Sequence, residues 1–323
     1  MHIFDAHSDI LADTMDKHAA GLRRNITRDH LPRLKKAGIS GLVLALWLAP
    51  GKDGQPDEQF RAMLDYLPGE LAETGDEIIM ARQMADVERA VKDGRLYAFL
   101  GVEGLSGLTG GAYGIRKLHE IGVRMISLTW NEKNDFATGI GSRAVCRGLS
   151  DEGRKAAGLM EQLGIVMDVS HLSEKSFWDV IDCTSVPLVA SHSNARAVCG
   201  AARNLTDQQI EAIAQRDGVI GLNSWGDFID EEAPTAERAL EHLDYLVRRA
   251  GIDHVGLGFD FCDYFGTDPT SVDDDKPLAL TEGLARCEDV PAFINRLSQK
   301  YSGDELDKIL YKNFHRVFRQ VIG

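Results

Sequence analysis

The sequence has few cysteines, no excess of basic residues and no apolar run long enough to cross a membrane. Its five cysteines are scattered and none belongs to a Cys-x-x-Cys pair. This argues against a zinc knuckle or a disulfide framework and favours reduced thiols in the cytoplasm. The net charge of −14 argues against nucleic acid or an anionic membrane surface as a partner, since both attract basic proteins.

Two further absences concern targeting. The most apolar run, residues 39–50, is too short to span a bilayer and predicts a buried strand. Met1 and His2 lead directly into the first predicted strand, without the basic and apolar regions of a signal peptide. We therefore expect a protein that has no membrane partner.

The composition is that of an ordinary globular enzyme, with 44% hydrophobic and 27% charged residues in a chain of 323. This length allows two average domains or one large α/β barrel. No internal repeat, low-complexity segment or linker divides the chain. We therefore expect a single domain over residues 1–323.

Apolar segments alternate with segments of helical periodicity along most of the chain. The first segment contains Phe4 to Asp9, and the strand-forming pairs Ile3-Phe4 and Ile10-Leu11 flank its polar residues. Seven further segments predict strands at residues 41–48, 96–102, 123–130, 165–169, 187–190, 219–223 and 254–259. Helical spacing between most of them predicts helices at residues 30–38, 56–75, 82–94, 113–122, 150–164, 206–218 and 235–250, and another that begins at Ser173.

Eight strands separated by helices predict an α/β fold with one closed (β/α)8 barrel of the TIM type. After the last strand we expect a C-terminal helical tail, from about residue 290 to residue 323, that packs on the barrel. Thr206-Asp207-Gln208-Gln209 and Ser302-Gly303-Asp304-Glu305 both match the capping-box pattern of a helix start.

His7 and Asp9 are the first candidates for chemistry. On a strand, side chains two residues apart point to the same side, so we expect this imidazole and this carboxylate to face one spot. Such a pair suits a divalent metal such as zinc, or it is a hydrogen-bonded pair that closes the strand. The short motif alone does not decide between the two interpretations.

Four more polar residues come directly after predicted strands. Because the C-terminal ends of the strands form the reactive face of a TIM barrel, we expect all of them to surround one opening with His7 and Asp9. Each alone could be a turn cap or a buried, satisfied side chain. Together they predict a metal centre. The four residues are Glu103, His171, His192 and Asp260.

Three histidines with Asp9 and Glu103 are more ligands than one open catalytic zinc needs. They match two divalent ions, most simply Zn²⁺, that share a bridging carboxylate and a water-derived hydroxide. Asp260 then remains as the proton carrier between that water and the leaving nitrogen. Direct ligation of a metal is the alternative role for Asp260.

With these residues in place, the sequence resembles the renal, or membrane, dipeptidase family of zinc metallodipeptidases, within the amidohydrolase-type barrels. The resemblance covers nearly the whole chain. Its most specific segments are Asp5-Ala6-His7-Ser8-Asp9, Val102-Glu103-Gly104, Asp168-Val169-Ser170-His171, Ser191-His192-Ser193-Asn194-Ala195, Arg203-Asn204, residues 253–261 and residues 313–318.

The resemblance implies a role for each site residue. His7 and Asp9 would bind one zinc ion, and His171 and His192 the other. Glu103 would bridge the two ions, and Asp260 would be the catalytic acid and base. Arg203, which the residue pattern alone does not single out, would fork onto the free carboxylate of a dipeptide.

The sequence departs from the family pattern at two places. Where the family usually has a histidine that polarises the scissile carbonyl, in a Leu-Thr-His setting, this sequence continues to Trp130. An indole donates one hydrogen bond and carries no charge, so Trp130 is a weaker replacement, and Asn131 is the other candidate donor to the substrate. Cys262 stands where many relatives have an aspartate.

The resemblance thus implies a bacterial zinc dipeptidase that hydrolyses small L,L- or L,D-dipeptides. Another hydrolase of this barrel class, acting on an N-acyl amino acid, a lactone or a phosphoester, is the first alternative, because a fold does not fix a substrate. A metal-binding protein that has lost catalysis is the second, prompted by Trp130. Arg203 favours a free carboxylate, Asp260 favours an enzyme, and the sequence allows a homodimer without fixing the oligomeric state.

Overall fold

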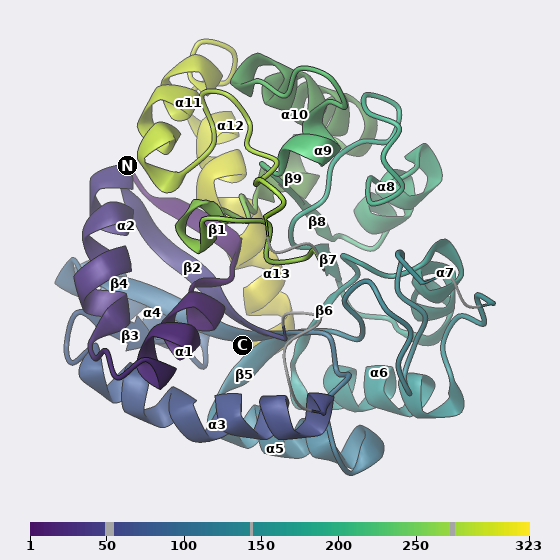
Figure 1. Cartoon of the computed structure of the whole chain (residues 1–323). Coiled ribbons are helices and arrows are strands. Elements are labelled where there is room, and N and C mark those ends of the chain that lie inside the picture. The colour runs from purple at the N-terminus through teal and green to yellow at the C-terminus, as the bar shows by residue number, and fades with distance from the viewer. Residues whose placement is uncertain (49–54, 143–144, 272–274) are drawn as a thin grey trace.

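The computed structural model describes residues 1–48, 55–142, 145–271 and 275–323. Within these residues, nine parallel strands form one sheet that curls into a nearly closed barrel (Figure 1). The strands are β1 (Ile3–Ser8), β2 (Ile39–Trp47), β3 (Ile78–Met80), β4 (Leu96–Glu103), β5 (Val123–Ser127), β6 (Val166–Asp168), β7 (Val189–Ala190), β8 (Val219–Leu222) and β9 (Val255–Leu257).

Helices surround the strands, as Figure 1 shows. The α-helices are α1 (Ile10–Ala19), α2 (Leu31–Ala37), α3 (Pro56–Glu73), α4 (Met84–Asp93), α5 (Gly114–Ile121), α6 (Asp151–Leu163), α7 (Glu174–Cys183), α8 (Asp207–Gln215), α9 (Gly226–Ile229), α10 (Ala236–Ala250), α11 (Val290–Leu297), α12 (Asp304–Asp307) and α13 (Asn313–Ile322). Short π-helical segments, η1 (Ile26–His30) and η6 (Lys308–Lys312), precede α2 and α13. The predicted TIM-type α/β barrel with a helical tail is confirmed.

The sheet order brings the first and last strands together. Eight strands follow the order β1-β2-β4-β5-β6-β7-β8-β9, and β3 pairs with β4 outside this path. Next to β9, the backbone N–H of Phe259 donates to Oδ1 of Asp5 in β1 over 2.8 Å. This side-chain bond ties the two ends of the sheet and aligns the C-terminal ends of the strands around one mouth.

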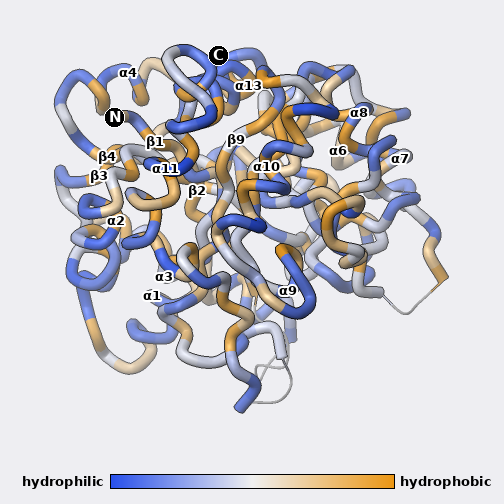
Figure 2. Tube along the Cα trace, turned by 90° about the horizontal axis from the view of Figure 1, so that it is seen from above, coloured by the Kyte–Doolittle hydropathy of each residue, from blue (hydrophilic) through white to orange (hydrophobic). Residues whose placement is uncertain are grey.

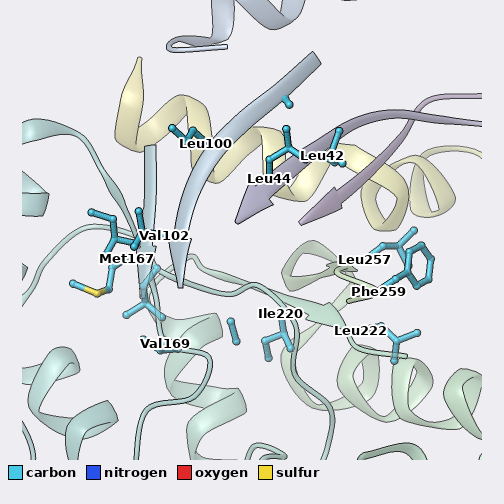
Figure 3. Packing of buried hydrophobic residues seen from close by; sticks show 14 of the residues in the cluster. Leu42, Leu44, Leu100, Val102, Met167, Val169, Ile220, Leu222, Leu257 and Phe259 are labelled. Atoms are coloured by element: carbon cyan, nitrogen blue, oxygen red, sulfur yellow. The ribbon is translucent and has the colours of Figure 1, made fainter. Parts of the chain in front are cut away.

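The hydrophobic core has two layers because strand side chains alternate between the two faces of the sheet. The inner layer fills the barrel and includes Phe4, Val43 and Phe99, with Phe314 and Phe318 of α13 packed against them. The tail helix α13 therefore covers the inner layer with its apolar side chains. In Figure 2 the surrounding helices alternate between hydrophobic and hydrophilic residues. Their apolar sides meet the outer layer, part of which Figure 3 labels: Leu42, Leu44, Leu100, Val102, Met167, Val169, Ile220, Leu222, Leu257 and Phe259.

Three local expectations were wrong. Ile10 and Leu11 do not extend the first strand, because β1 ends at Ser8 and α1 begins at Ile10. A short apolar run fits a strand or a buried helix equally well, and here it packs the buried side of α1. The strand β3 was not among the eight predicted strands, because its three residues are too few to show a period.

The third error concerns the helix starts. Thr206 forms the expected capping box with Gln209 at the start of α8. The pattern at Ser302 does not form one, because Gly303 is the N-cap of α12 and no side chain caps it. A capping box needs the serine itself at the N-cap, and here the helix begins one residue later.

No helix in the described part of the chain is long and apolar enough to cross a membrane. The apolar run of residues 39–50 forms β2 as far as Trp47, and its last two residues lie outside the described ranges. The polar stretch of residues 131–148, apart from 143–144, which are not described, contains only isolated bridges, at Lys133–Thr138 and Gly139–Leu172.

Candidate metal centre

The structure brings all six strand-end candidates together at the mouth of the barrel. His7 lies in β1 and Glu103 is the last residue of β4. His171 and His192 follow β6 and β7, while Asp9 and Asp260 follow β1 and β9; none of the six is exposed. Asp9 is not on the strand, however. It is the N-cap of α1, so the turn rather than strand alternation places it beside His7.

Glu103 lies between two groups of candidate ligands, and each of its two carboxylate oxygens faces one of these groups. Oε1 lies 2.8 Å from Nε2 of His171 and 3.3 Å from Nε2 of His192. Oε2 lies 3.6 Å from Nε2 of His7, which is itself 3.4 Å from Oδ1 of Asp9. A carboxylate in this position can join two cations, one on each side.

The unsatisfied polar atoms fit a bound cation. Both ring nitrogens of His7 and Oδ1 of Asp9 are buried without a hydrogen-bond partner in the described residues. Ligand atoms of His7, Asp9 and Glu103 lie within 4.8 Å of one another, and so do those of Glu103, His171 and His192. Imidazole nitrogen with carboxylate oxygen is a ligand set that suits zinc, so the residues fit a divalent metal.

Burial raises the pKa of two of the carboxyl groups that face His7. It raises the pKa of Glu103 to about 8, and it raises the pKa of Asp260 above its usual range. Burial opposes the charged form of His7, but the carboxylates of Glu103 and Asp9 outweigh it and raise the pKa of His7 well above its usual value. The pocket thus concentrates acidic groups that favour positive charge between them.

His171 and His192 are neutral imidazoles, the form that binds metals. Burial lowers the pKa of each well below its usual value, and the positive charge of Arg203 adds to the effect. The far ring nitrogen of each histidine also has a partner. Nδ1 of His171 bonds to Oδ1 of Asn131 over 2.9 Å, and Nδ1 of His192 bonds to Oγ of Ser191 over 2.7 Å.

Asn131 was predicted as a substrate donor. The structure places its amide oxygen on His171, where it accepts the Nδ1 hydrogen, while Nε2 faces Glu103 and lies 2.9 Å from Nε2 of His192. Trp130 lies alongside, with its ring centre 6.0 Å from that of His171.

Trp47 packs against Trp130, and the two rings form an aromatic wall beside His171. Trp47 was not among the predicted site residues. It ends β2 directly opposite Glu103 in the register, and its ring centre lies 5.6 Å from that of Trp130. Its indole N–H is buried and has no partner in the described residues. The strand alternation through Val43 and Ala45 could have placed this side chain on the inner face.

Asp260 has the position of a proton carrier beside the two groups of ligands. Its Oδ1 lies 3.9 Å from Nε2 of His7, while its Oδ2 accepts a hydrogen bond from Asn223 over 3.1 Å. Its neighbour Cys262 is a buried thiol whose pKa burial raises well above its usual value. The Sγ atom of Cys262 lies 3.5 Å from the backbone oxygen of Asp260, and ligand atoms of Asp9, Asp260 and Cys262 lie within 4.8 Å of one another.

Arg203 lies under the same mouth and is 8% exposed. It donates from Nη1 to Oγ of Ser193 over 2.9 Å and from Nη2 to the backbone oxygen of His192 over 3.0 Å. Its Nε is buried without a partner in the described residues, and its guanidinium carbon lies 5.9 Å from the ring centre of Phe228. The side chain is therefore held in place with donors to spare for an anion.

Comparison with known proteins decides the family. The model of the family described as membrane dipeptidase, peptidase family M19, matches residues 1–322. The chain belongs to the membrane dipeptidase family. As a member it is a metal-dependent hydrolase of the dipeptidase class, which agrees with the six residues gathered at the barrel mouth.

Individual proteins are also similar to this dipeptidase-family chain. A protein of Klebsiella pneumoniae named "Uncharacterized protein in pqqA 5'region" is 33% identical over 280 residues, which are 83% of this chain and 98% of that protein. "Dipeptidase tcpJ" of Claviceps purpurea is 30% identical over 76% of this chain and 56% of its own length. A crystal structure of a metallo peptidase from Rhodobacter sphaeroides, bound to a phosphinate mimic of L-Ala-D-Ala, has a TM-score of 0.86 at 27% identity and 99% coverage of both chains.

Proposed function

We propose that this dipeptidase-family chain is a binuclear zinc enzyme that hydrolyses small dipeptides of the L,L or L,D type. The observation that carries the proposal is the position of Glu103. One of its oxygens faces His171 and His192, and the other faces His7 next to Asp9. This is the arrangement that two ions sharing one carboxylate require.

Two bound zinc ions would supply a nucleophile from water near neutral pH and would polarise the scissile carbonyl. Asp260 then moves the proton. Its raised pKa suits a carboxyl group that takes a proton from the attacking water and returns it to the leaving nitrogen. Asn223 holds the other oxygen of Asp260 and so orients it for this transfer.

Arg203 binds the free carboxylate of the dipeptide in this proposal. Two of its N–H groups are fixed by Ser193 and His192, and the remaining donors can form a forked pair with a carboxylate. A free carboxylate at a fixed distance from the metals would make dipeptides better substrates than carboxyl-blocked amides or lactones.

The side chains that stand in for the family histidine affect the rate of hydrolysis. In place of the family histidine this chain offers only uncharged donors, the indole N–H groups and the amide N–H groups of Asn131, whose oxygen is bonded to His171. Loss of one oxyanion donor typically costs about 10²- to 10³-fold in turnover. We therefore expect slower hydrolysis than a relative with the histidine achieves.

The test is a substrate panel on zinc-loaded protein. It compares L-Ala-L-Ala and L-Ala-D-Ala with N-acetyl-alanine and a simple lactone, and it repeats each assay after chelation and after zinc is restored. The ligand of the Rhodobacter protein supports including an L,D-dipeptide. We expect zinc-dependent hydrolysis of at least one dipeptide. Hydrolysis of only the lactone or the N-acyl compound would contradict the proposal.

Three broader properties remain proposals of the same kind. We infer that residues 1–323 act as one domain, supported by the packing of apolar side chains of the tail helix α13 against the inner layer of the barrel core. The five free cysteines support a reducing compartment such as the cytoplasm. A homodimer stays a prediction that size measurements in solution would test.

A further inference from the structure

Asp168, the last residue of β6, is a buried carboxylate to which the proposed function gives no role. Its Oδ1 accepts hydrogen bonds from the backbone N–H groups of Ser170 and Ser191, and each of these bonds is 3.0 Å long. Its Oδ2 accepts the hydroxyl hydrogen of Ser191 over 2.5 Å. In every one of these bonds the carboxyl group of Asp168 is the acceptor.

A second hydrogen bond connects Ser191 to His192. Its Oγ lies 2.7 Å from Nδ1 of His192. A hydroxyl has one hydrogen, and here Asp168 already accepts it, so Ser191 must accept the hydrogen of Nδ1. His192 therefore carries its hydrogen on Nδ1, and its Nε2, which lies 2.9 Å from Nε2 of His171 and 3.3 Å from Oε1 of Glu103, has a lone pair for a cation.

Asp168 could also be considered a metal ligand, because its ligand atom lies within 4.8 Å of those of His7 and His192. Its hydrogen bonds argue against this role. Both oxygens already accept hydrogen bonds, Oδ1 from two backbone N–H groups and Oδ2 from the hydroxyl of Ser191. The geometry fits a residue that acts through Ser191.

We propose that Asp168 is a positioning residue that acts through Ser191 to hold His192 in the tautomer with hydrogen on Nδ1, so that Nε2 can bind a divalent cation. The proposal rests on the proposed function, since it assigns His192 as a ligand. Carboxylates behind metal-binding histidines typically contribute about 10- to 100-fold in metal affinity.

The direction of the hydrogen-bond chain makes a sharp test possible. In Asp168→Asn the amide oxygen can still accept both backbone N–H groups, but the amide nitrogen replaces Oδ2 and donates to Ser191. The hydroxyl of Ser191 then donates to Nδ1 of His192, and the ring hydrogen moves to Nε2. That nitrogen can no longer bind a metal, although the side chain keeps its size and the fold keeps its backbone bonds.

Four variants separate this effect from a general loss of structure: Asp168→Asn, Ser191→Ala, the double variant and Asp179→Asn. Asp179 is the matched control, since it is also buried and accepts a backbone N–H, from Leu149 over 2.9 Å, but belongs to α7. The readouts are zinc per chain after dialysis, zinc affinity, and the tautomer of His192 from imidazole nitrogen NMR of metal-free protein.

We expect Asp168→Asn to lose one of two zinc ions and to show the hydrogen on Nε2. Ser191→Ala should weaken that site about 10- to 100-fold. The double variant should bind zinc better than Asp168→Asn alone, because no hydroxyl remains to reverse the tautomer. Asp179→Asn should match the wild type in zinc content and in the His192 signal.

Three results would overturn this relay, the hydrogen-bond chain from Asp168 through Ser191 to His192. The first is full zinc affinity in Asp168→Asn, and the second is a double variant that binds zinc less well than Asp168→Asn. The third is a wild type in which His192 carries its hydrogen on Nε2. The tautomer measurement needs neither metal nor activity. A wild type that shows the Nδ1 hydrogen but binds no zinc would therefore refute the proposed function and leave the relay standing.

Discussion

At the scale of single residues, two members of the proposed centre are held in backbone conformations that their side chains disfavour. His171 has a φ of 66° and Asp260 a φ of 60°, both in the left-handed region. Such residues cost about 1–3 kcal/mol each and cluster at functional sites. The turns after β6 and β9 accept this strain and aim both side chains into the barrel mouth.

Asp260→Asn should keep both metal ions and lower turnover about 10²- to 10⁴-fold, because an amide cannot carry the proton. The measurements are metal content by elemental analysis and the turnover of a dipeptide. Asp263→Asn is the control, since Asp263 pairs with Arg33 rather than with the centre, and it should stay near wild-type activity. Loss of a metal ion in Asp260→Asn would instead make Asp260 a ligand.

Arg203→Met should chiefly raise KM for free dipeptides and leave carboxyl-blocked analogues little changed. The reason is that the variant removes the forked contact with the substrate carboxylate while keeping the apolar part of the side chain. Initial rates over a range of concentrations of both substrate types measure the effect. An equal loss for both types would show that Arg203 does not bind the carboxylate.

At the scale of elements, helix starts depend on which residue takes the N-cap position. Thr206→Ala should lower the free energy of unfolding by about 1 kcal/mol, since Thr206 caps α8 and forms a capping box with Gln209. Ser302→Ala should stay within about 0.5 kcal/mol of the wild type, because Ser302 does not cap α12. Urea unfolding of both variants measures the difference, and equal losses would contradict these assignments.

The same scale shows what the sequence could predict. His7, Glu103 and His192 were found because each lies at or just after the end of an apolar run that is visible in the sequence. The bond from Asp168 to Ser191 was not found, because it joins residues from different strand ends that only the folded barrel brings together. The three residues of β3 leave too little pattern to predict a strand, whereas Trp47 could have been found from the alternation along β2.

At the scale of the whole molecule, the barrel has a reactive end and a stabilising end. At the end opposite the metal centre, the hydroxyl of Tyr97 lies 2.9 Å from Nε2 of His2 and 2.6 Å from Nε2 of His315. Burial lowers the pKa of His2 to about 4 and that of His315 to about 3. Both histidines thus stay neutral in the folded protein under conditions that protonate them in the unfolded chain.

The free energy of unfolding should therefore fall as the pH decreases below about 6.5, where unfolded histidine takes up protons, and should continue to fall towards pH 3–4. The sign follows from folded-state pKa values that lie below the unfolded value. Chemical unfolding of metal-free protein between pH 8 and pH 4 measures this. His315→Gln should flatten the dependence, and an unchanged slope would contradict the role of His315.

The central claim is that the barrel mouth holds two divalent ions with Glu103 between them. Its most direct test is the number of zinc ions per chain, determined by elemental analysis after dialysis against zinc and removal of the excess. We expect close to two ions per chain in the wild type and fewer in Glu103→Ala. A wild-type chain that retains one ion or none would contradict it.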